Sequence, residues 1–413
     1  MATTETIRFT EHGLPPSLTH AGTRRFLTGA GLPAREGPLF RFAVLREQGL
    51  RTYAGLAGVP AAPRDLFVLG ELSAPGSGAW VTLDGRTGAL FLTGRPHRGG
   101  ADPGLPGDPL APDAGTLLGF ESAVADLERT RGRFAAYESR YGRAAASGAT
   151  DELLALFQGG MRGAELPAFW RIAALILPLA RVPTPGIQLR LDLPGRLLDE
   201  EFGAGHITRC EDADLPAALT HEPTRRFLKD IGLPEEDDSY VFPRLPLRTL
   251  TEHHGGSAGL PPHATRLVPV GHLADGTDIV VDGATGEILS WHRSAARLSP
   301  LNSDVSALAF TTWLLRRERV LDEAHDGYLT ARAPGRLAEA VRAVLRATDH
   351  PAALHTPTDR DGPTVAWRPW PLLTTVPVEH ASRRTPERFP LRPPATGPGP
   401  AEREGAWEWP ERV

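Results

Sequence analysis

The chain has 413 residues, enough for two or three domains that each bury a core, and its 41% hydrophobic and 23% charged residues are ordinary for a globular protein. A net charge of −5 argues against a general nucleic-acid-binding surface, and the single cysteine, Cys210, excludes an intrachain disulfide and a cysteine-rich metal site. The most apolar run, residues 172–182, is too short for a membrane span of about twenty residues, and no secretory signal pattern opens the chain, so we expect a cytoplasmic protein.

The first predicted element is a short helix within LTHAGTRRFLTGAGLP, residues 18–33, and LTHEPTRRFLKDIGLP, residues 219–234, repeats 11 of its 16 positions. We expect the threonine at the second position of each segment, Thr19 in the first, to cap the helix start with its hydroxyl. Gly31 is expected to end the helix in the left-handed conformation and to bring the leucine that follows it onto Leu27. Most of the shared residues therefore have a structural explanation.

The second repeated element is a predicted β-hairpin. WVTLDGRTGALFL, residues 80–92, corresponds to DIVVDGATGEILS, residues 278–290, and the two repeated elements follow each other in the same order in both halves. An Asp-Gly turn between two β-branched, apolar runs is typical of a hairpin. A calcium loop is the alternative, but the alternating acidic ligands and the final glutamate of such loops are missing. We therefore predict a turn within a duplicated domain.

A helix follows each predicted hairpin. Residues 301–321 of the second copy show an apolar stripe at helical spacing, and Ser303 or Asp304 is expected to cap this helix. Its counterpart in the first copy is residues 116–134. Each copy is thus a helix, several short strands and a helix, which is an α+β unit of about 120 residues.

The predicted fold class is α+β, with two tandem domains that each contain a small, mostly antiparallel sheet with flanking helices. Helical periodicity also predicts a connector between the copies and a last helix at residues 334–348. The proline-rich composition of residues 389–413 predicts an extended or disordered tail. The expected boundaries are 1–140 for the first copy, 141–190 for the helical connector, 191–325 for the second copy and 326–413 for the C-terminal extension.

Signatures of catalysis are missing from the sequence. It contains no P-loop, HExxH, zinc-deaminase or GxSxG motif, so we predict no enzyme, no catalytic residue and no cofactor. His253, His254 and His263 lie in one Gly/Pro-rich loop and are conceivable metal ligands, but solvated loop histidines are the preferred interpretation, and no metal is predicted. His20 and His221 occupy matched positions, where local packing is favoured over a catalytic role.

Charge is unevenly distributed along the chain. In the repeated pairs Arg24–Arg25 and Arg225–Arg226, we expect one arginine to anchor an acidic residue and the other to be solvated, rather than a phosphate grip. Residues 190–240 hold 13 acidic and 6 basic residues. A run of charges is usually a solvated loop, but if the acidic segments on either side of the repeated helix lie close together, their field would attract a basic protein. The candidate partner-binding residues are Glu211, Asp212, Asp214, Glu235, Glu236, Asp237 and Asp238.

A longer pattern extends over the second copy. DLPGRLLDEEFG, LPAALTHEPTRRFLKDIGLP, VPVGHL, DIVVDGATGEILSW and LNSDVSALAFTTWLL occur in that order. This pattern resembles the SUKH superfamily, specifically the fourth SUKH group of bacterial immunity proteins. The resemblance covers residues 191–323 closely and residues 7–133 more loosely. Its motifs are structural, so they indicate the fold more specifically than the partner.

The resemblance implies a cytoplasmic α+β protein that binds and neutralises the toxin domain of a polymorphic toxin system and is not an enzyme. Many toxins of such systems are nucleases or nucleic-acid deaminases. We therefore expect a cognate toxin, basic in character, as the partner, and neither direct nucleic-acid binding nor a membrane partner. The first copy lacks the DLPGRLLDEEFG lead-in and is expected to be mainly structural. A non-enzymatic scaffold or regulatory adaptor that bridges two proteins is the alternative.

Overall fold

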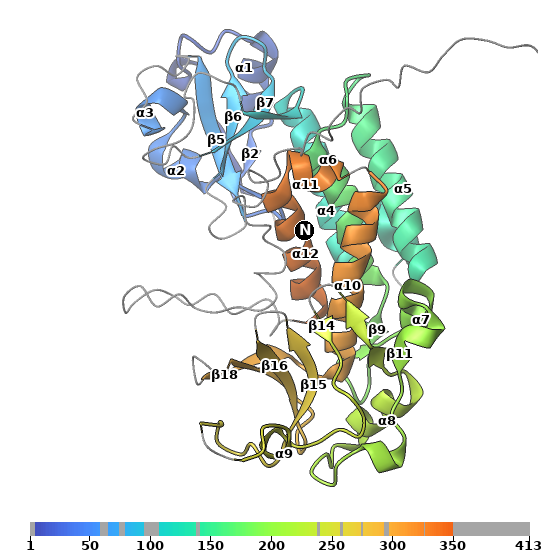
Figure 1. Cartoon of the computed structure of the whole chain (residues 1–413). Helices are drawn as coiled ribbons and strands as arrows, with labels where there is room; N and C mark the ends of the chain where they lie inside the picture. The colour runs from blue at the N-terminus through green and yellow to red at the C-terminus, as the bar shows by residue number, and fades with distance from the viewer. Residues whose placement is uncertain are drawn as a thin grey trace, which may run out of the picture. The chain divides into compact units, whose positions relative to one another are not determined.

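The computed structural model (Figure 1) describes most of the chain up to residue 349. The predicted proline-rich tail, residues 389–413, lies outside the described residues. Within them, each helix is too short or too polar to cross a membrane. The described stretches are residues 5–57, 65–73, 79–94, 107–137, 141–237, 240–256, 259–273, 276–292, 297–325 and 327–349.

Each copy is built on an antiparallel six-stranded sheet. The first has the order β3-β5-β6-β7-β8, with β4 also paired to β5, and the second has the order β13-β14-β15-β16-β17-β18. This arrangement confirms the predicted α+β class. The strands of the first sheet are β3 Phe40–Arg41, β4 Arg51–Thr52, β5 Leu66–Leu72, β6 Ala79–Asp84, β7 Leu90–Gly94 and β8 Asp108–Ala111. Those of the second are β13 Glu236–Asp237, β14 Tyr240–Val241, β15 Leu267–Leu273, β16 Thr277–Asp282, β17 Ile288–His292 and β18 Arg297–Asn302.

Helices and short strand pairs complete the described chain. The helices are α1 Ala21–Thr28, α2 Ala43–Gln48, α3 Tyr53–Ala57, α4 Ala114–Arg129, α5 Arg143–Gly160, α6 Ala168–Ile176, α7 Leu197–Phe202, α8 Glu222–Asp230, α9 Leu250–His253, α10 Val305–Glu323, α11 Tyr328–Arg332 and α12 Pro334–Thr348. Short 3₁₀ turns are η1 Glu11–Gly13, η2 Gly132–Tyr137, η3 Leu177–Arg181, η4 Ala204–His206 and η5 Asp212–Asp214. The short pairs are β1 Thr6–Ile7 with β2 Leu32–Pro33, β9 Thr184–Pro185 with β10 Leu191–Asp192, and β11 Ile207–Thr208 with β12 Leu233–Pro234.

The elements follow the same order in both halves of the chain. Strands β1 and β2 flank α1 as β11 and β12 flank α8, and α4 and α5 follow the first sheet as α10 and α12 follow the second. Asp113 caps α4 and Asp304 caps α10, because each carboxylate accepts hydrogen bonds from first-turn N–H groups. The helix predicted at 301–321 begins at Val305, since Leu301 and Asn302 complete β18. The helix predicted at 334–348 is confirmed as α12.

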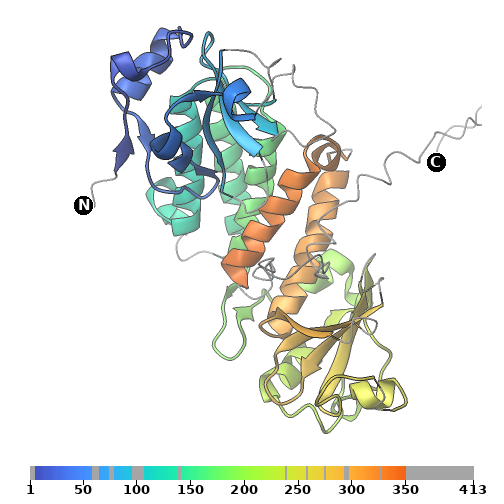
Figure 2. The ribbon, with the colours of Figure 1, turned by 90° about the vertical axis from the view of Figure 1, so that its left-hand side faces the viewer.

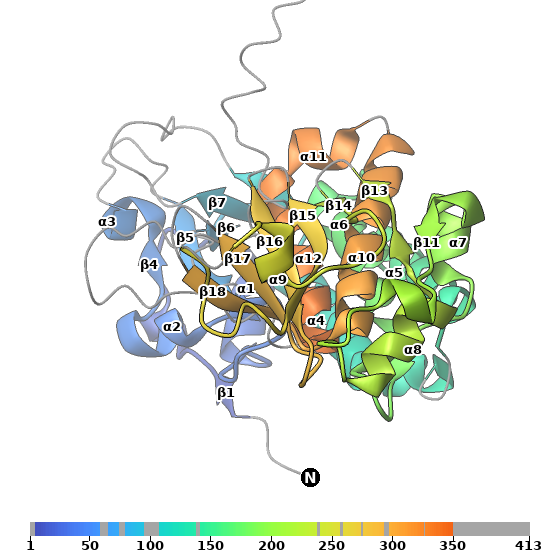
Figure 3. The same cartoon turned by 60° about the horizontal axis from the view of Figure 1, so that its bottom comes forward.

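Both faces of the second sheet are covered. Ile279 and Val281 of β16 join the main core with α10, in which residues 305–315 are all buried. Val280 faces the opposite side, because side chains alternate along a strand, and it packs there with Leu250 of α9. Figure 2 shows α10 and α12 side by side, and Figure 3 shows α9 over β16 and β17. Helix α9 therefore lies on the face of the second sheet opposite α10.

The predicted connector is helical and consists of α5, α6 and η3. Its apolar residues enter two cores. Phe157 and Trp170 pack within the core of the first copy, whereas Ile176 and Val182 belong to the main core of the second. Ala340 on α12 packs against both cores. A fragment cut at residue 191 would therefore leave part of the second core unfilled.

The two repeated elements of each copy contact each other. In the first copy, the backbone N–H groups of Thr19 and His20 both donate to the Gly85 carbonyl in the hairpin turn, at 2.8 Å. His20 Nδ1 accepts from the Thr23 N–H at 3.2 Å, so the histidine caps α1. The prediction of a threonine cap is wrong, since the Thr19 hydroxyl faces the Gly85 carbonyl. The corresponding residues of the second copy are Thr220, His221, Gly283 and Thr224, with His221 Nδ1 bonded to the Thr224 hydroxyl at 2.8 Å.

The hairpin turns and the helix ends agree with their predictions. Asp84 Oδ1 accepts from the N–H groups of Arg86 and Thr87, which confirms the turn. Gly31 and Gly232 have φ angles of 72° and 80°, the left-handed conformation expected at the helix stops. Leu27 and Leu32, which were predicted to meet at the first helix stop, and their counterparts Leu228 and Leu233 are fully buried within the core of their own copy.

Candidate functional site

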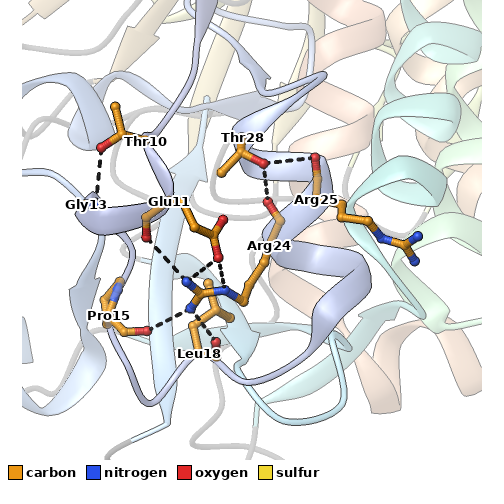
Figure 4. A network of polar contacts seen from close by, with 8 residues as sticks. All are labelled: Thr10, Glu11, Gly13, Pro15, Leu18, Arg24, Arg25 and Thr28. Atoms are coloured by element: carbon orange, nitrogen blue, oxygen red, sulfur yellow. Dashed lines mark hydrogen bonds and ion pairs between the residues drawn. The ribbon is translucent and has the colours of Figure 1, made fainter.

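Arg24 on α1 anchors the chain segment that precedes this helix (Figure 4). Its Nε donates to Glu11 Oε1 at 2.7 Å, and its Nη1 donates to the Leu18 carbonyl at 3.0 Å. Arg25 is exposed and points away from this network in Figure 4. The expectation that one arginine anchors an acidic residue while the other is solvated is confirmed in the first copy.

Asp212 takes the place of Glu11 in the second copy. Arg225 donates to its Oδ1 at 3.3 Å, and the Lys229 ammonium donates to its Oδ2 at 2.8 Å. The hydrogen bond from Lys229, supported by the charge of that residue and by Arg225, holds the pKa of Asp212 below its ordinary value. The charge of Asp212 is thus compensated inside its own domain, as that of Glu11 is.

Two further candidates lie beside Asp212. Asp214 Oδ2 accepts from the backbone N–H of Glu211 at 2.8 Å, so this carboxylate stabilises the turn that leads into α8. Glu211 is exposed, and its carboxylate forms a capping box with Asp214. Thr10 and Gly13 stand at these two positions in the first copy, where the Thr10 hydroxyl accepts from the Gly13 N–H at 3.2 Å. The capping role is therefore repeated, although the carboxylates are not.

The acidic run after α8 contains a strand. Glu236 and Asp237 form β13, the edge strand of the second sheet, which pairs with β14. Glu235 and Glu236 are exposed, and Glu235 accepts a 3.3 Å hydrogen bond from the Thr208 hydroxyl. The side chain of Asp237 and all of Asp238 lie outside the part of the chain that the structure describes.

The strand pairing carries the two acidic segments in different directions. In the antiparallel pair of β11 and β12, Ile207 lies opposite Pro234. Residues 211–214 continue from one end of this pair, and residues 235–238 continue from the other. The structure therefore shows two separate acidic segments on the second copy and does not bring them together through this strand pair.

A groove of about 550 Å³ lies next to β14 in the second copy. Val241 and Leu245 contribute apolar side chains that are 44% and 36% exposed, unusually high values for residues of this kind. The polar residues that line the groove are Arg244, Arg248, His253 and His272. The groove is therefore apolar and basic, in contrast to the neighbouring acidic strand.

A cluster of histidines surrounds Asp278 next to this groove. His254 Nε2 lies 2.8 Å from Asp278 Oδ2, and His272 Nδ1 lies 2.6 Å from Asp278 Oδ1. The His253 ring stacks on His272 with 5.1 Å between ring centroids and meets His254 edge-on at 5.0 Å. One ligand atom from each of His253, His254 and Asp278 lies within 4.8 Å of the other two. Two imidazoles and a carboxylate are thus placed within reach of one ion.

Strand geometry explains how the cluster forms. Asp278 lies two residues before Val280 on β16 and so faces α9, whose C-terminal end carries His253 and His254. Strict alternation along β15 would place His272 on the other face, with Val270. A β-bulge between Pro269 and Gly271 shifts the register, so His272 lies opposite Asp278.

Burial and hydrogen bonding oppose each other at Asp278. Burial by itself would raise the pKa of this carboxyl, but the hydrogen bonds from His272 and His254 outweigh it and hold the pKa below its ordinary value. Burial, followed by the nearby His272, lowers the pKa of His253. The cluster therefore combines an ionised carboxylate with a histidine that favours its neutral form near neutral pH.

From the sequence, His253 and His254 were preferred as solvated loop histidines, which the hydrogen bond between His254 and Asp278 contradicts for His254. Sequence reasoning joined these two residues to His263, which is exposed and lies in a left-handed turn apart from the grouped residues. Asp278 and His272 were missed. The hairpin register that pairs their strands was the available signal, because it places β15 and β16 side by side.

These features define the chain as a tandem duplication of one α+β unit, with its charged and histidine-rich surfaces on the second copy. A family model described as SUKH-4 immunity protein matches residues 1–159 and 193–367. The chain therefore belongs to the SUKH-4 immunity protein family, and membership implies an immunity role and binding of a cognate toxin. Neither a curated protein nor a solved structure matches the chain.

Proposed function

We propose that this protein binds and neutralises the toxin domain of a bacterial polymorphic toxin system, a nuclease or nucleic-acid deaminase, in the cytoplasm of the cell that makes both. It acts by binding and blocking the toxin and not by catalysis. The observation that carries this proposal is the family match, which extends over both copies, residues 1–159 and 193–367.

We assign the contact surface to the acidic residues of the second copy other than Asp212 and Asp214. Asp212 and Asp214 serve the domain itself, through the Arg225 ion pair and the turn before α8. Glu236 lies on β13, the edge strand of the second sheet, where carboxylates favour and orient the approach of a basic protein. The residues assigned to partner contact are Glu211, Glu235, Glu236, Asp237 and Asp238.

The test is co-expression of the full chain with the toxin domain encoded by the neighbouring gene. We expect growth to be rescued and the two proteins to purify together as a complex. The full chain is used because Ile176 and Val182, which precede the second copy, fill part of its core. Co-purification without rescue would favour the scaffold or adaptor alternative. The absence of both rescue and co-purification would contradict the proposal.

A further inference from the structure

The histidine cluster of the second copy has an arrangement that hydrogen bonding alone does not explain. The Asp278 carboxylate satisfies His254 with one oxygen and His272 with the other. Within the described residues, the His253 ring makes no hydrogen bond, although it lies against the two other imidazoles. An imidazole nitrogen near a carboxylate and a second imidazole, with no bond of its own, is available to a further group.

We propose that His253, His254 and Asp278 bind a Zn²⁺ ion, with His272 as a positioning residue. Two imidazole nitrogens and one carboxylate oxygen suit zinc and disfavour calcium and magnesium, which prefer oxygen ligands. Ligand atoms around tetrahedral zinc lie about 3.3 Å apart, given metal–ligand bonds of about 2.0–2.1 Å. The present separations, all within 4.8 Å, need only small side-chain rotations to reach that spacing.

His272 completes the arrangement from the neighbouring strand. Its Nδ1 lies 2.6 Å from Asp278 Oδ1, which leaves Oδ2 for the ion in place of the present contact with His254. A donor that holds the second oxygen of a ligating carboxylate fixes the orientation of that ligand. Because His272 and Asp278 lie opposite each other on paired strands, the sheet provides a rigid base for the site.

The proposed site belongs to the second copy alone. At the positions of His272 and Asp278, the first copy has Glu71 and Trp80, which also pair across two strands. The stretch from Thr249 to Leu267 carries the two adjacent histidines. It is longer than the corresponding stretch of the first copy, from Thr52 to Leu66. Three protein ligands leave one coordination position for water or for a side chain of another molecule. The inference does not depend on toxin neutralisation.

The experiment is calorimetric titration of the metal-free full chain with ZnCl₂. We expect one Zn²⁺ per chain, and we expect His253→Gln, His254→Gln and Asp278→Asn each to weaken binding by more than tenfold. His272→Gln should weaken it by about ten- to a hundredfold, as loss of a positioning residue does. His263→Gln is the matched control from the same loop and should leave the affinity unchanged.

A second measurement separates loss of the ligand from loss of the fold. Thermal unfolding without metal is recorded for each variant, and the exposed His253 provides the decisive substitution, since its loss leaves the core intact. Visible absorption of the Co²⁺-loaded chain reports on the coordination directly. Absence of saturable Zn²⁺ binding, or equal affinity of the His253→Gln variant and the unchanged chain, would overturn the proposal.

Discussion

The imidazole of His221, at the start of α8, lies directly against Gly286 in the hairpin turn between β16 and β17. A Cβ atom at Gly286 would overlap His221 Nδ1, and the φ angle of this glycine is +79°. The first copy repeats the relationship with His20 and Gly88. In each copy, the two repeated sequence segments, the start of the helix and the hairpin turn, therefore contact each other.

Replacement of Gly286 by alanine is expected to break this contact. We expect Gly286→Ala to lower the free energy of unfolding by about 2–4 kcal/mol, because the left-handed backbone and the overlap with His221 both oppose a Cβ. Gly276→Ala is the control, since Gly276 has a φ of +83° with open space around it and should lose only about 1–2 kcal/mol. Urea unfolding measures both, and equal losses would show that the overlap has no effect.

Glu121 on α4 is expected to make stability depend on pH. Burial raises the pKa of Glu121 to about 7, against the hydrogen bonds that it accepts from the N–H groups of Leu39 and Phe40. The folded chain therefore holds a proton that the unfolded chain releases near the ordinary pKa of 4.5. The resulting stabilisation is complete below that value and is lost as the pH rises through about 7.

The variant Glu121→Gln should remove this contribution, which is on the order of 3 kcal/mol for a shift of this size. Urea unfolding of both chains at several pH values between about 5 and 8 would show a smaller decline in the variant. Glu318→Gln tests the same effect at a second buried carboxyl, because burial also raises the pKa of Glu318 to about 7. Parallel pH profiles of the unchanged chain and Glu121→Gln would contradict the assignment.

The thiol of Cys210 is expected to be unreactive in the folded protein. Burial, together with the nearby Asp214, raises the pKa of Cys210 to about 12, and the residue is 4% exposed. Thiols react as thiolates, so both the protonation state and the burial protect it. Titration with a chromogenic disulfide reagent should find no thiol in the native chain and one after denaturation. A rapid native reaction would show that the β11 region opens readily.

The acidic edge strand is expected to accelerate toxin binding. The double variant Glu235→Ala/Glu236→Arg copies Ala34 and Arg35 of the first copy and should slow association by about tenfold at low salt. The control is Asp212→Asn, whose charge is already compensated by Lys229 and Arg225. Stopped-flow association rates at two salt concentrations measure the effect. Equal rates for the double variant and the unchanged chain would remove the edge strand from the contact surface.

Elements defined by local signals were predictable from the sequence. The Asp-Gly turns, the left-handed glycines and the helix at 334–348 each depend on residues a few positions apart. The helix cap was not predictable, because the Thr19 N–H and hydroxyl are both directed to the carbonyl of Gly85, which is distant in sequence. His20 becomes the cap as a result.

The same distinction between local signals and contacts distant in sequence applies to the candidate site residues. His253 and His254 were recognisable as adjacent histidines, but their acidic neighbour lies on another strand and depends on the bulge in β15. The assignment of the acidic residues to partner contact stays a prediction. The domain boundaries at 140/141, 190/191 and 325/326 also stay predictions.

The bulge in β15 has a counterpart in the first copy. A bulge also interrupts β5, between Val68 and Gly70, at the position that corresponds to the bulge in β15. In the first copy it presents Glu71 to Arg41, at 2.6 Å, and in the second it presents His272 to Asp278. One backbone irregularity thus positions an ion pair in the first copy and an imidazole–carboxylate contact in the second.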